Sequence, residues 1–464
     1  MAVHPLEPDA AEMRAMAKAA LSFVEDFITG LPDAPAVDLE GALEEARRLA
    51  EPAPQEGAPL EPLLDVVARG AAKAFNTTGP GYLAYIPGGG LFAAALGEFL
   101  AAAINRYVGV WNAAPILAQL EWTVVRWLCD LFGYPPEARG VLTSGGSLSN
   151  FSGIVAAREA LLGEDLGSGV LYVTEQTHAS VAKSARLAGI RRENIRPVAT
   201  DAALRMDPRA LEEAVARDRR AGRRPFCVVP SAGTTNTGAV DPLAEVIGVT
   251  HREGLWAHVD AAYGGAFYMT DRGRRLFRGI EEADSITLDP HKAMFLPYGT
   301  GALLVREGRR LREAHEVGAD YLQDLGTEEE IPNFTDYSPE LSRSFRGLAV
   351  WLPVKLHGLG AFRAALDEKL DLARYLYDRL RESEHLDVPW EPELTVVAFR
   401  HRGGNDLDPR LLELINGSRR VFLSSTMLDG RFTIRACIVS HRTHRDRIEE
   451  AAEIILKAAA LLAA

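Results

Sequence analysis

Lys292 is the residue of this sequence whose position points most directly to chemistry. It closes the segment Ser285–Lys292, in which a short apolar run is followed by a proline and a histidine. Burial near a core lowers the pKa of an amine, and an unprotonated amine attacks carbonyl groups. A lysine can also pack its stem and keep its charged end in solvent, so this segment alone leaves both interpretations open.

A second segment has the composition of an anion site. Thr143–Asn150 is rich in glycine and serine, and it precedes the helical pattern of Phe151–Leu162. Small residues at the start of a helix leave backbone N–H groups free to converge on a phosphate, which the helix dipole also favours. An ordinary helix cap would look the same.

An aspartate completes the set. Asp260 ends the strand-like run Leu255–Val259, and the small residues Ala261 and Ala262 follow it. A phosphate cradle, a strand-end aspartate and a strand-end lysine, in this order, are the parts that a pyridoxal phosphate site needs. The aspartate keeps the pyridine nitrogen protonated, the cradle holds the phosphate and the lysine forms a Schiff base.

Four other motifs lack the context that their chemistry requires. Gly79–Ala84 matches a dinucleotide fingerprint but follows no strand, and Ser180–Lys183 has the serine acylase spacing without its companion elements. Gly145–Ser149 falls one glycine short of a nucleophile elbow, and His441 and His444 have no third metal ligand near them in sequence. No metal is therefore expected.

The surrounding pattern predicts the elements that position these residues. Short apolar runs alternate with helical stretches from about residue 80 to 350, which indicates βα units around a largely parallel sheet. The expected strands are Val170–Val173, Phe226–Val229, Leu255–Val259, Ser285–Leu288 and Ala302–Val305. The expected helices are Ala11–Thr29, Leu39–Ala50, Leu91–Ile104, Pro208–Arg219, Pro242–Arg252, Ala361–Glu384 and one from Arg447, with further strands at Leu394–Phe399 and Thr433–Val439.

These patterns divide the 464 residues into three parts. We expect a helical N-terminal segment at 1–75, a large cofactor-binding domain at 76–355 and a small α+β domain at 356–464. No repeat or low-complexity tract interrupts them.

Composition narrows the setting of the protein. The net charge of −13 repels phosphate backbones, so nucleic acid is not an expected partner. The three cysteines, Cys129, Cys227 and Cys437, are far apart, which fits a reducing cytoplasm. No export signal is expected from the acidic start, and the most apolar run, Leu91–Ile104, is too short to span a membrane.

At this point the chain resembles the group II pyridoxal-phosphate decarboxylases, which act on aromatic amino acids, glutamate and cysteine sulfinate. The likeness runs from about Gly81 to the C-terminus. Its motifs are Gly81–Tyr85, Thr143–Asn150, His178–Ser180, Gly233–Thr235, His258–Tyr263, Asp289–Lys292, Ser342–Arg346 and Ile434–Arg435. The resemblance implies a fold type I pyridoxal-phosphate enzyme and a cytoplasmic homodimer with its active sites at the interface.

The resemblance also implies a role for individual residues. Lys292 would carry the cofactor, Asp260 would face the pyridine nitrogen, and His178 and Ala262 would lie on opposite faces of the ring. The phosphate would be held by Gly146, Ser147 and Leu148, with Thr235 near the phenolic oxygen and His291 beside the phosphate. Without the surrounding match, His178 could equally be an ordinary core histidine.

The substrate end departs from the family pattern. Ala293 stands where relatives usually place a bulky residue, and the turn Pro87–Gly90 carries few side chains. With the family's geometry, Tyr85, Ile86, Trp111 and Ala293 would line an apolar pocket, which favours an aromatic or bulky apolar amino acid over glutamate.

Tyr337 is the expected proton donor to Cα after CO2 leaves. It lies in Leu325–Ser338, a polar stretch without helical or strand period that predicts a mobile loop. In the family, a loop at this place closes over the partner's active site. A surface tyrosine without a catalytic role remains the alternative.

The predicted reaction is α-decarboxylation of an L-amino acid to an amine and CO2. An aldehyde-forming oxidative deaminase, an aminotransferase or another carbon–carbon lyase would keep the same cofactor. A scaffold without catalysis is the alternative from another class, and the presence of Lys292, Asp260 and His178 argues against it.

Overall fold

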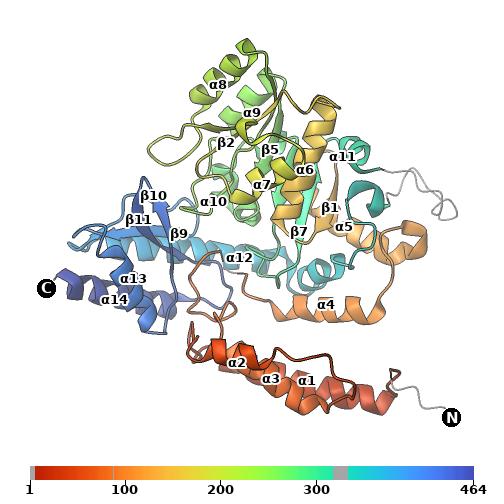
Figure 1. Ribbon diagram of the computed structural model, residues 1–464, viewed down its shortest axis with the longest axis vertical. Helices are drawn as coiled ribbons and strands as arrows, with labels where there is room; N and C mark the ends of the chain where they lie inside the picture. Colours follow the sequence, from red (N-terminus) through yellow and green to blue (C-terminus); the bar gives the residue numbers. More distant parts are fainter. Residues whose placement is uncertain (1–5, 87, 317–332, 464) are drawn as a thin grey trace.

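The large domain is built on one seven-stranded sheet. A computed structural model describes residues 6–86, 88–316 and 333–463. The strand order is β1-β7-β6-β5-β4-β2-β3, and only β7 runs antiparallel to its neighbours. Helices lie on both faces of this sheet (Figure 1). The α/β class with a mostly parallel sheet is therefore confirmed.

The predicted strands are present, and two more join them. The strands of this sheet are β1 (Arg139–Thr143), β2 (Gly169–Thr174), β3 (Ile195–Val198), β4 (Arg224–Val228), β5 (Trp256–Asp260), β6 (Ser285–Leu288) and β7 (Gly301–Val305). Strands β1 and β3 were not predicted. Strand β1 begins with Arg139 and Gly140, and β3 contains Arg196 and Pro197, so neither presents a continuous apolar run.

The helices of the large domain are α4 (Phe92–Ile104), α5 (Pro115–Leu131), α6 (Gly146–Leu161), α7 (Ala179–Leu187), α8 (Pro208–Arg220), α9 (Leu243–Arg252), α10 (Asp271–Leu276) and α11 (Gly308–His315). Four of them, α4, α6, α8 and α9, correspond to predicted ones, and α5, α7, α10 and α11 were not predicted. Short 3-10 helices are η1 (Trp111–Ala113), η2 (Arg192–Asn194), η3 (Gly265–Met269), η4 (Ile280–Glu282) and η6 (Phe334–Tyr337).

Helix α6 is the central helix of the large domain. It contacts β4, β5, β6 and β7 of the sheet as well as α7 and α11. Nine of its sixteen residues are buried, and most of them are small. Small side chains let this helix approach the sheet closely, so its first turn is fixed relative to the strand ends.

The small domain has its own sheet and core. Strands β8 (Leu386–Asp387), β9 (Val396–His401), β10 (Ser424–Leu428) and β11 (Arg431–Cys437) form an antiparallel sheet. Helix α13 (Asp408–Gly417) packs against this sheet, and α14 (Arg445–Ala463) packs against α13 and the long helix α12 (Gly347–Arg381). Helix α12 joins the two domains (Figure 1). It begins earlier than predicted and is broken at Gly358, whose φ is 72°.

The N-terminal helices form a separate layer below α4 (Figure 1). They are α1 (Ala10–Gly30), α2 (Ala42–Arg48) and α3 (Leu60–Ala72), and none of them has a buried residue in this chain. No helix in the described part of the chain has the length and apolarity to cross a membrane.

A buried ion pair anchors the start of α12. Arg343 pairs with Glu121 of α5, and both side chains are fully buried. The other oxygen of Glu121 accepts the N–H of Gly347 at 2.9 Å, while Arg343 donates to the carbonyl of Leu142 in β1 at 2.7 Å. The pair therefore ties α5, β1 and α12 together at one point.

Breaking this pair should weaken the fold strongly. Glu121→Ala leaves the Arg343 guanidinium buried without its counter-charge, which costs about 3–5 kcal/mol of unfolding free energy. Urea unfolding followed by circular dichroism measures the change. The control is Glu453→Ala, which removes an exposed pair with Lys457 and should leave the urea midpoint unchanged. Equal midpoints for both variants would contradict this role of Glu121.

Candidate active site

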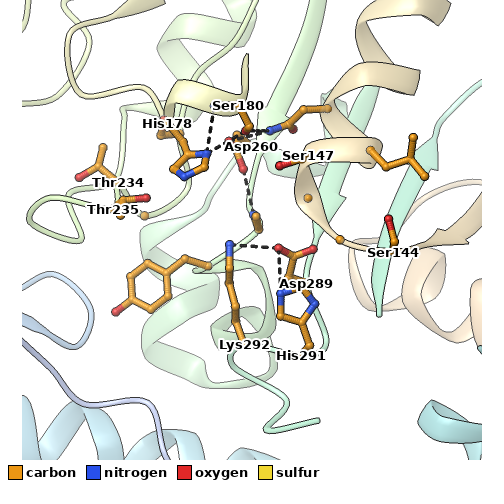
Figure 2. Close-up of a pocket in the computed structure, with 18 residues that line it drawn as sticks. Ser144, Ser147, His178, Ser180, Thr234, Thr235, Asp260, Asp289, His291 and Lys292 are labelled. Carbon is orange, nitrogen blue, oxygen red and sulfur yellow. Dashed lines mark hydrogen bonds and ion pairs between the residues drawn. The ribbon is translucent and has the colours of Figure 1, made fainter. Parts of the chain in front are cut away.

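The predicted cofactor residues line one cavity. It has a volume of about 360 Å³ and lies where the carboxyl ends of β5 and β6 meet the first turns of α6 and α7. Figure 2 shows its lining, with Asp260 and His178 on one side and Lys292 on another. Nine sequence-predicted residues line it: Gly146, Ser147, Leu148, His178, Thr235, Asp260, Ala262, His291 and Lys292.

Lys292 enters the cavity from the turn after β6. Its Nζ lies 3.0 Å from Oδ2 of Asp289, whose side chain is buried. His291, on the same turn, has its Nε2 3.6 Å from this oxygen. The turn is closed by the hydrogen bond from the Lys292 N–H to the Asp289 carbonyl, 2.9 Å. The sequence therefore positions a lysine and its counter-ion on one rigid turn.

Asp260 is a buried carboxylate at the end of β5, with 7% of its surface exposed. Its Oδ1 accepts the N–H of Ala262 at 3.1 Å, and its Oδ2 accepts Nδ2 of Asn150 at 3.1 Å. Two donors stabilise the charged form of a carboxylate. The structure thus presents a fixed negative charge to the cavity.

The first turn of α6 has the features of a phosphate cradle. Gly145 has a φ of 150° and provides no side-chain cap, so the N–H groups of Gly146 and Ser147 remain for a ligand. The N–H of Leu148 donates to the Gly145 carbonyl at 3.0 Å. A Cβ on Gly146 would lie 2.8 Å from Asp289 Oδ2 and 3.1 Å from the Ala262 side chain. A larger residue than glycine would therefore fill the space in front of these N–H groups.

The lining fits pyridoxal phosphate. The donor set combines a helix start for a phosphate, a carboxylate for a pyridinium and an amine for an aldehyde. Ala262 is small, with 7% of its surface exposed, which leaves room for a flat ring. His178, exposed, faces the same cavity.

His178 begins helix α7 and is fixed by its neighbour. Its Nδ1 lies 2.8 Å from Ser180 Oγ and accepts the Ser180 N–H at 3.3 Å. Because a backbone N–H can only donate, Nδ1 carries no proton, and neutral His178 holds its proton on Nε2.

His291 and Thr235 are also held by hydrogen bonds. His291 Nδ1 bonds to the Thr300 carbonyl at 2.8 Å, and burial lowers the pKa of His291. The carbonyl of Thr235 accepts from Arg435 of β11, so the small domain supports this side of the cavity.

The four predicted substrate residues do not line this cavity. Ala293 is fully buried in the core of the large domain, because the turn after Lys292 directs its side chain inward; its prediction as a pocket residue is corrected. Tyr85 is exposed and has a φ of 55°, and Ile86 packs against the core. Trp111 starts η1, where its backbone N–H donates to Asn333 Oδ1.

Tyr337 also lies elsewhere. It belongs to η6, which packs against β1 and α11, and only 9% of its surface is exposed. Of the predicted loop Leu325–Ser338, residues 325–332 lie outside the described part. Tyr337 does not line the cavity of its own chain, and its expected role at the partner's active site stays a prediction.

Three polar residues of the cavity contact predicted residues but were not themselves predicted. They are Asn150, Ser180 and Asp289, which bind Asp260, His178 and Lys292 respectively. Each lies inside a motif that the sequence analysis singled out, but residue spacing does not tell which side chain contacts which. Among the described residues, no group of three histidine, cysteine or acidic side chains is arranged to hold a metal.

Comparison with known proteins agrees with this geometry. Residues 43–402 match the pyridoxal-dependent decarboxylase conserved domain. The aromatic-L-amino-acid decarboxylase of Bacillus atrophaeus is 33% identical, over 98% of this chain and 96% of the relative. The phenylacetaldehyde synthase of Arabidopsis thaliana is 27% identical, over 98% of this chain and 97% of the relative.

A solved structure extends the likeness to three dimensions. The Oryza sativa TDC crystal structure with PLP and tryptamine superposes with a TM-score of 0.93, at 27% identity. The superposition covers 99% of this chain and all of the other.

Covalent labelling tests the position of Lys292. Borohydride reduction of the protein loaded with pyridoxal phosphate should fix the cofactor on the peptide that contains Lys292, because this amine faces the cavity. Peptide mass spectrometry identifies the site. Lys183, on α7, serves as the internal control and should stay unlabelled. Label on Lys183, or persistent stoichiometric label in Lys292→Ala, would contradict the assignment.

Proposed function

Because the chain belongs to the pyridoxal-dependent decarboxylase family, it is a pyridoxal-phosphate-dependent carboxy-lyase of amino acids, and we propose that its substrate is an aromatic L-amino acid. The observation that carries this proposal is the match to an aromatic-L-amino-acid decarboxylase at 33% identity over 98% of the chain. The fold type I architecture agrees with the superposition over its whole length.

The charges of the cavity support an uncharged side chain. Among the eighteen residues that line it, Lys292 is the only lysine, and no arginine is present. A substrate with a second carboxylate would need a matched cation. The exposed ring of Tyr298 lies 5.8 Å from the ring of His291, so an aromatic surface adjoins the cavity.

When bound, pyridoxal phosphate supplies a carbonyl for the substrate amine and a conjugated ring that accepts the electrons of the Cα–carboxylate bond. We assign to Asp260 the task of holding a proton on the ring nitrogen. The first-turn N–H groups of Gly146 and Ser147 would hold the phosphate, with Leu148 lining the same end of the cavity, and Lys292 would provide the amine for the carbonyl.

The two faces of the ring receive different residues. Ala262 supports one face, and His178 covers the other and excludes water from it. His291 and Thr235 complete the rim. Together these residues orient the substrate so that the bond to its carboxylate stands across the ring plane, as the electron flow requires.

We also propose a homodimer. The groove between α1 and α4 is almost entirely apolar and contains Leu21, Val24, Leu96 and Phe99. Helices without a buried residue are marginal in water by themselves. A second copy of the chain would cover α1–α3 and α4 together. We propose that Tyr85, Ile86 and Trp111 contact the substrate at the interface between the two copies.

The proposed location is the cytoplasm. All three cysteines are buried and free, which suits a reducing compartment. The domain limits at residues 75 and 355 stay predictions, although the break of α12 at Gly358 lies close to the second limit.

Product analysis tests the proposed substrate. The purified enzyme with pyridoxal phosphate should release CO2 and the matching amine from tyrosine, tryptophan, phenylalanine or 3,4-dihydroxyphenylalanine, and at least 100-fold more slowly from glutamate. A difference in rate of about 100-fold is typical of a substrate whose polar groups find no matching partners in the site. Mass spectrometry of the products measures both.

Three results would contradict the proposal. Faster turnover of glutamate would reject the aromatic class. Aldehyde, ammonia and peroxide in place of the amine would indicate an aldehyde-forming oxidative deaminase. One relative of the chain is named as a synthase of an aldehyde, phenylacetaldehyde. Transfer of the amino group to a keto acid would indicate an aminotransferase.

Charge placed in the apolar groove tests the dimer. Phe99→Glu buries a carboxylate if the groove is an interface, so the variant should sediment with the mass of one chain and the unchanged protein with twice that mass. Leu461→Glu on the exposed end of α14 is the matched control and should keep the larger mass. A Phe99→Glu variant that keeps the larger mass would reject this interface.

A further inference from the structure

A buried layer of polar side chains lies directly behind the cavity. It consists of Trp256 and His258 of β5, Ser285 of β6 and Asn150 of α6. His258 and Ser285 are fully buried, and Asn150 is 1% exposed. None of the reaction steps assigned above uses these four residues. Buried polar groups are costly unless paired, so their partners need a full account.

Hydrogen bonds connect these residues into one chain that ends at Asp260. Trp256 Nε1 lies 2.8 Å from Ser285 Oγ, which lies 2.7 Å from His258 Nδ1. His258 Nε2 is 3.1 Å from Asn150 Oδ1. Asn150 Nδ2 in turn is 3.1 Å from Asp260 Oδ2 and 3.1 Å from Ser180 Oγ.

One direction of donation leaves every member of this chain with a partner. An indole N–H only donates, so Ser285 Oγ accepts from Trp256 and gives its own proton to His258 Nδ1. The proton of neutral His258 is then on Nε2, from which it is donated to Asn150 Oδ1. The side-chain amide of Asn150 is thereby held in one orientation, with one N–H donating to Asp260 and the other to Ser180.

The neutral state of His258 follows from its surroundings. Burial lowers the pKa of this imidazole to about 4, although the charge of Asp260 opposes the shift. A neutral ring keeps one proton, as the chain of hydrogen bonds requires. Gly153 leaves the space that the ring occupies, because a Cβ there would lie 2.4 Å from its Cε1.

A branch of the same chain reaches the other face of the cavity. Ser180 Oγ accepts from Asn150, which leaves its proton for His178 Nδ1 at 2.8 Å. The carboxylate of Asp260 and the ring of His178 are therefore held by the two N–H bonds of a single amide. Figure 2 shows Ser180 between His178 and Asp260.

We propose that Asn150, oriented by His258, is a positioning residue that keeps Asp260 ionised and aimed at the cofactor nitrogen while it fixes His178 over the ring. The inference rests on the proposed roles of Asp260 and His178. Removing the donor leaves Oδ2 of Asp260 buried against an apolar group, which favours the protonated carboxyl. A neutral carboxyl no longer attracts the pyridinium.

Several titratable groups surround Asp260 and belong to any pH profile of this site. They are His258 on its own strand, Tyr263 in the following turn, His178 at the start of α7, and Asp289, His291 and Lys292 on the turn after β6. A substitution at Asn150 removes the hydrogen-bond partner of His258 Nε2 and acts on His178 through Ser180.

Binding of pyridoxal phosphate to the apo protein tests the proposal without relying on turnover. The dissociation constant is measured from pH 6 to 9 by quenching of protein fluorescence. Asn150→Leu should bind about tenfold to 100-fold more weakly at pH 7, the range for losing a hydrogen bond to a charged group.

Two controls separate hydrogen bonding from packing. Ser152→Ala changes another buried polar residue of α6, one whose hydroxyl has no hydrogen-bond partner in the described part of the chain, and should bind like the unchanged protein. His258→Gln keeps a donor for Asn150 and should stay within about threefold, whereas His258→Leu should behave like Asn150→Leu. If Asn150→Leu does not fold, the pair of His258 variants decides.

The outcomes also separate this inference from the proposed function. Asp260→Asn with unchanged affinity would reject the role of Asp260 itself. Weak binding by Asp260→Asn together with unchanged affinity and pH profile in Asn150→Leu would reject only the positioning role. Equal losses in His258→Gln and His258→Leu would show that packing, and not the donated proton, matters at that position.

Discussion

The burial of the Asp260 carboxylate is the constraint on which the arrangement of this site depends. A carboxylate that is 7% exposed stays charged only if donors surround it. The chain supplies one from the backbone at Ala262 and one from Asn150, on a helix that begins more than a hundred residues earlier. Helix α6 must therefore pack at a fixed, short distance from the sheet, and its small buried residues allow this close approach.

The same close packing of α6 on the sheet also positions the phosphate end of the cavity. The first turn of α6 brings the N–H groups of Gly146 and Ser147 to the carboxyl edge of the sheet, where β6 delivers Lys292 and Asp289. One helix thus sets the distance between the charge that faces the ring nitrogen and the cradle at the opposite end. Glu121 and Arg343 hold the neighbouring elements, α5, β1 and α12, in place.

Much of this could be predicted from sequence, because periodicity and strand ends are local properties. Strand β6 was predicted with its observed limits, and nine cofactor residues that the motifs indicated line one cavity. Asn150 and His258 lay inside motifs, yet their contact joins residues 108 positions apart. Ala293 was misplaced because a turn directs its side chain inward, into the core of the large domain.

The central claim is that the protein holds a proton on the ring nitrogen of its cofactor through Asp260. Nitrogen NMR of the enzyme reconstituted with pyridoxal phosphate labelled with ¹⁵N in the ring reads the protonation of that atom directly. The account predicts a protonated nitrogen from pH 6 to 9, and an unprotonated one in Asp260→Ala. An unprotonated nitrogen in the unchanged enzyme at neutral pH would contradict it.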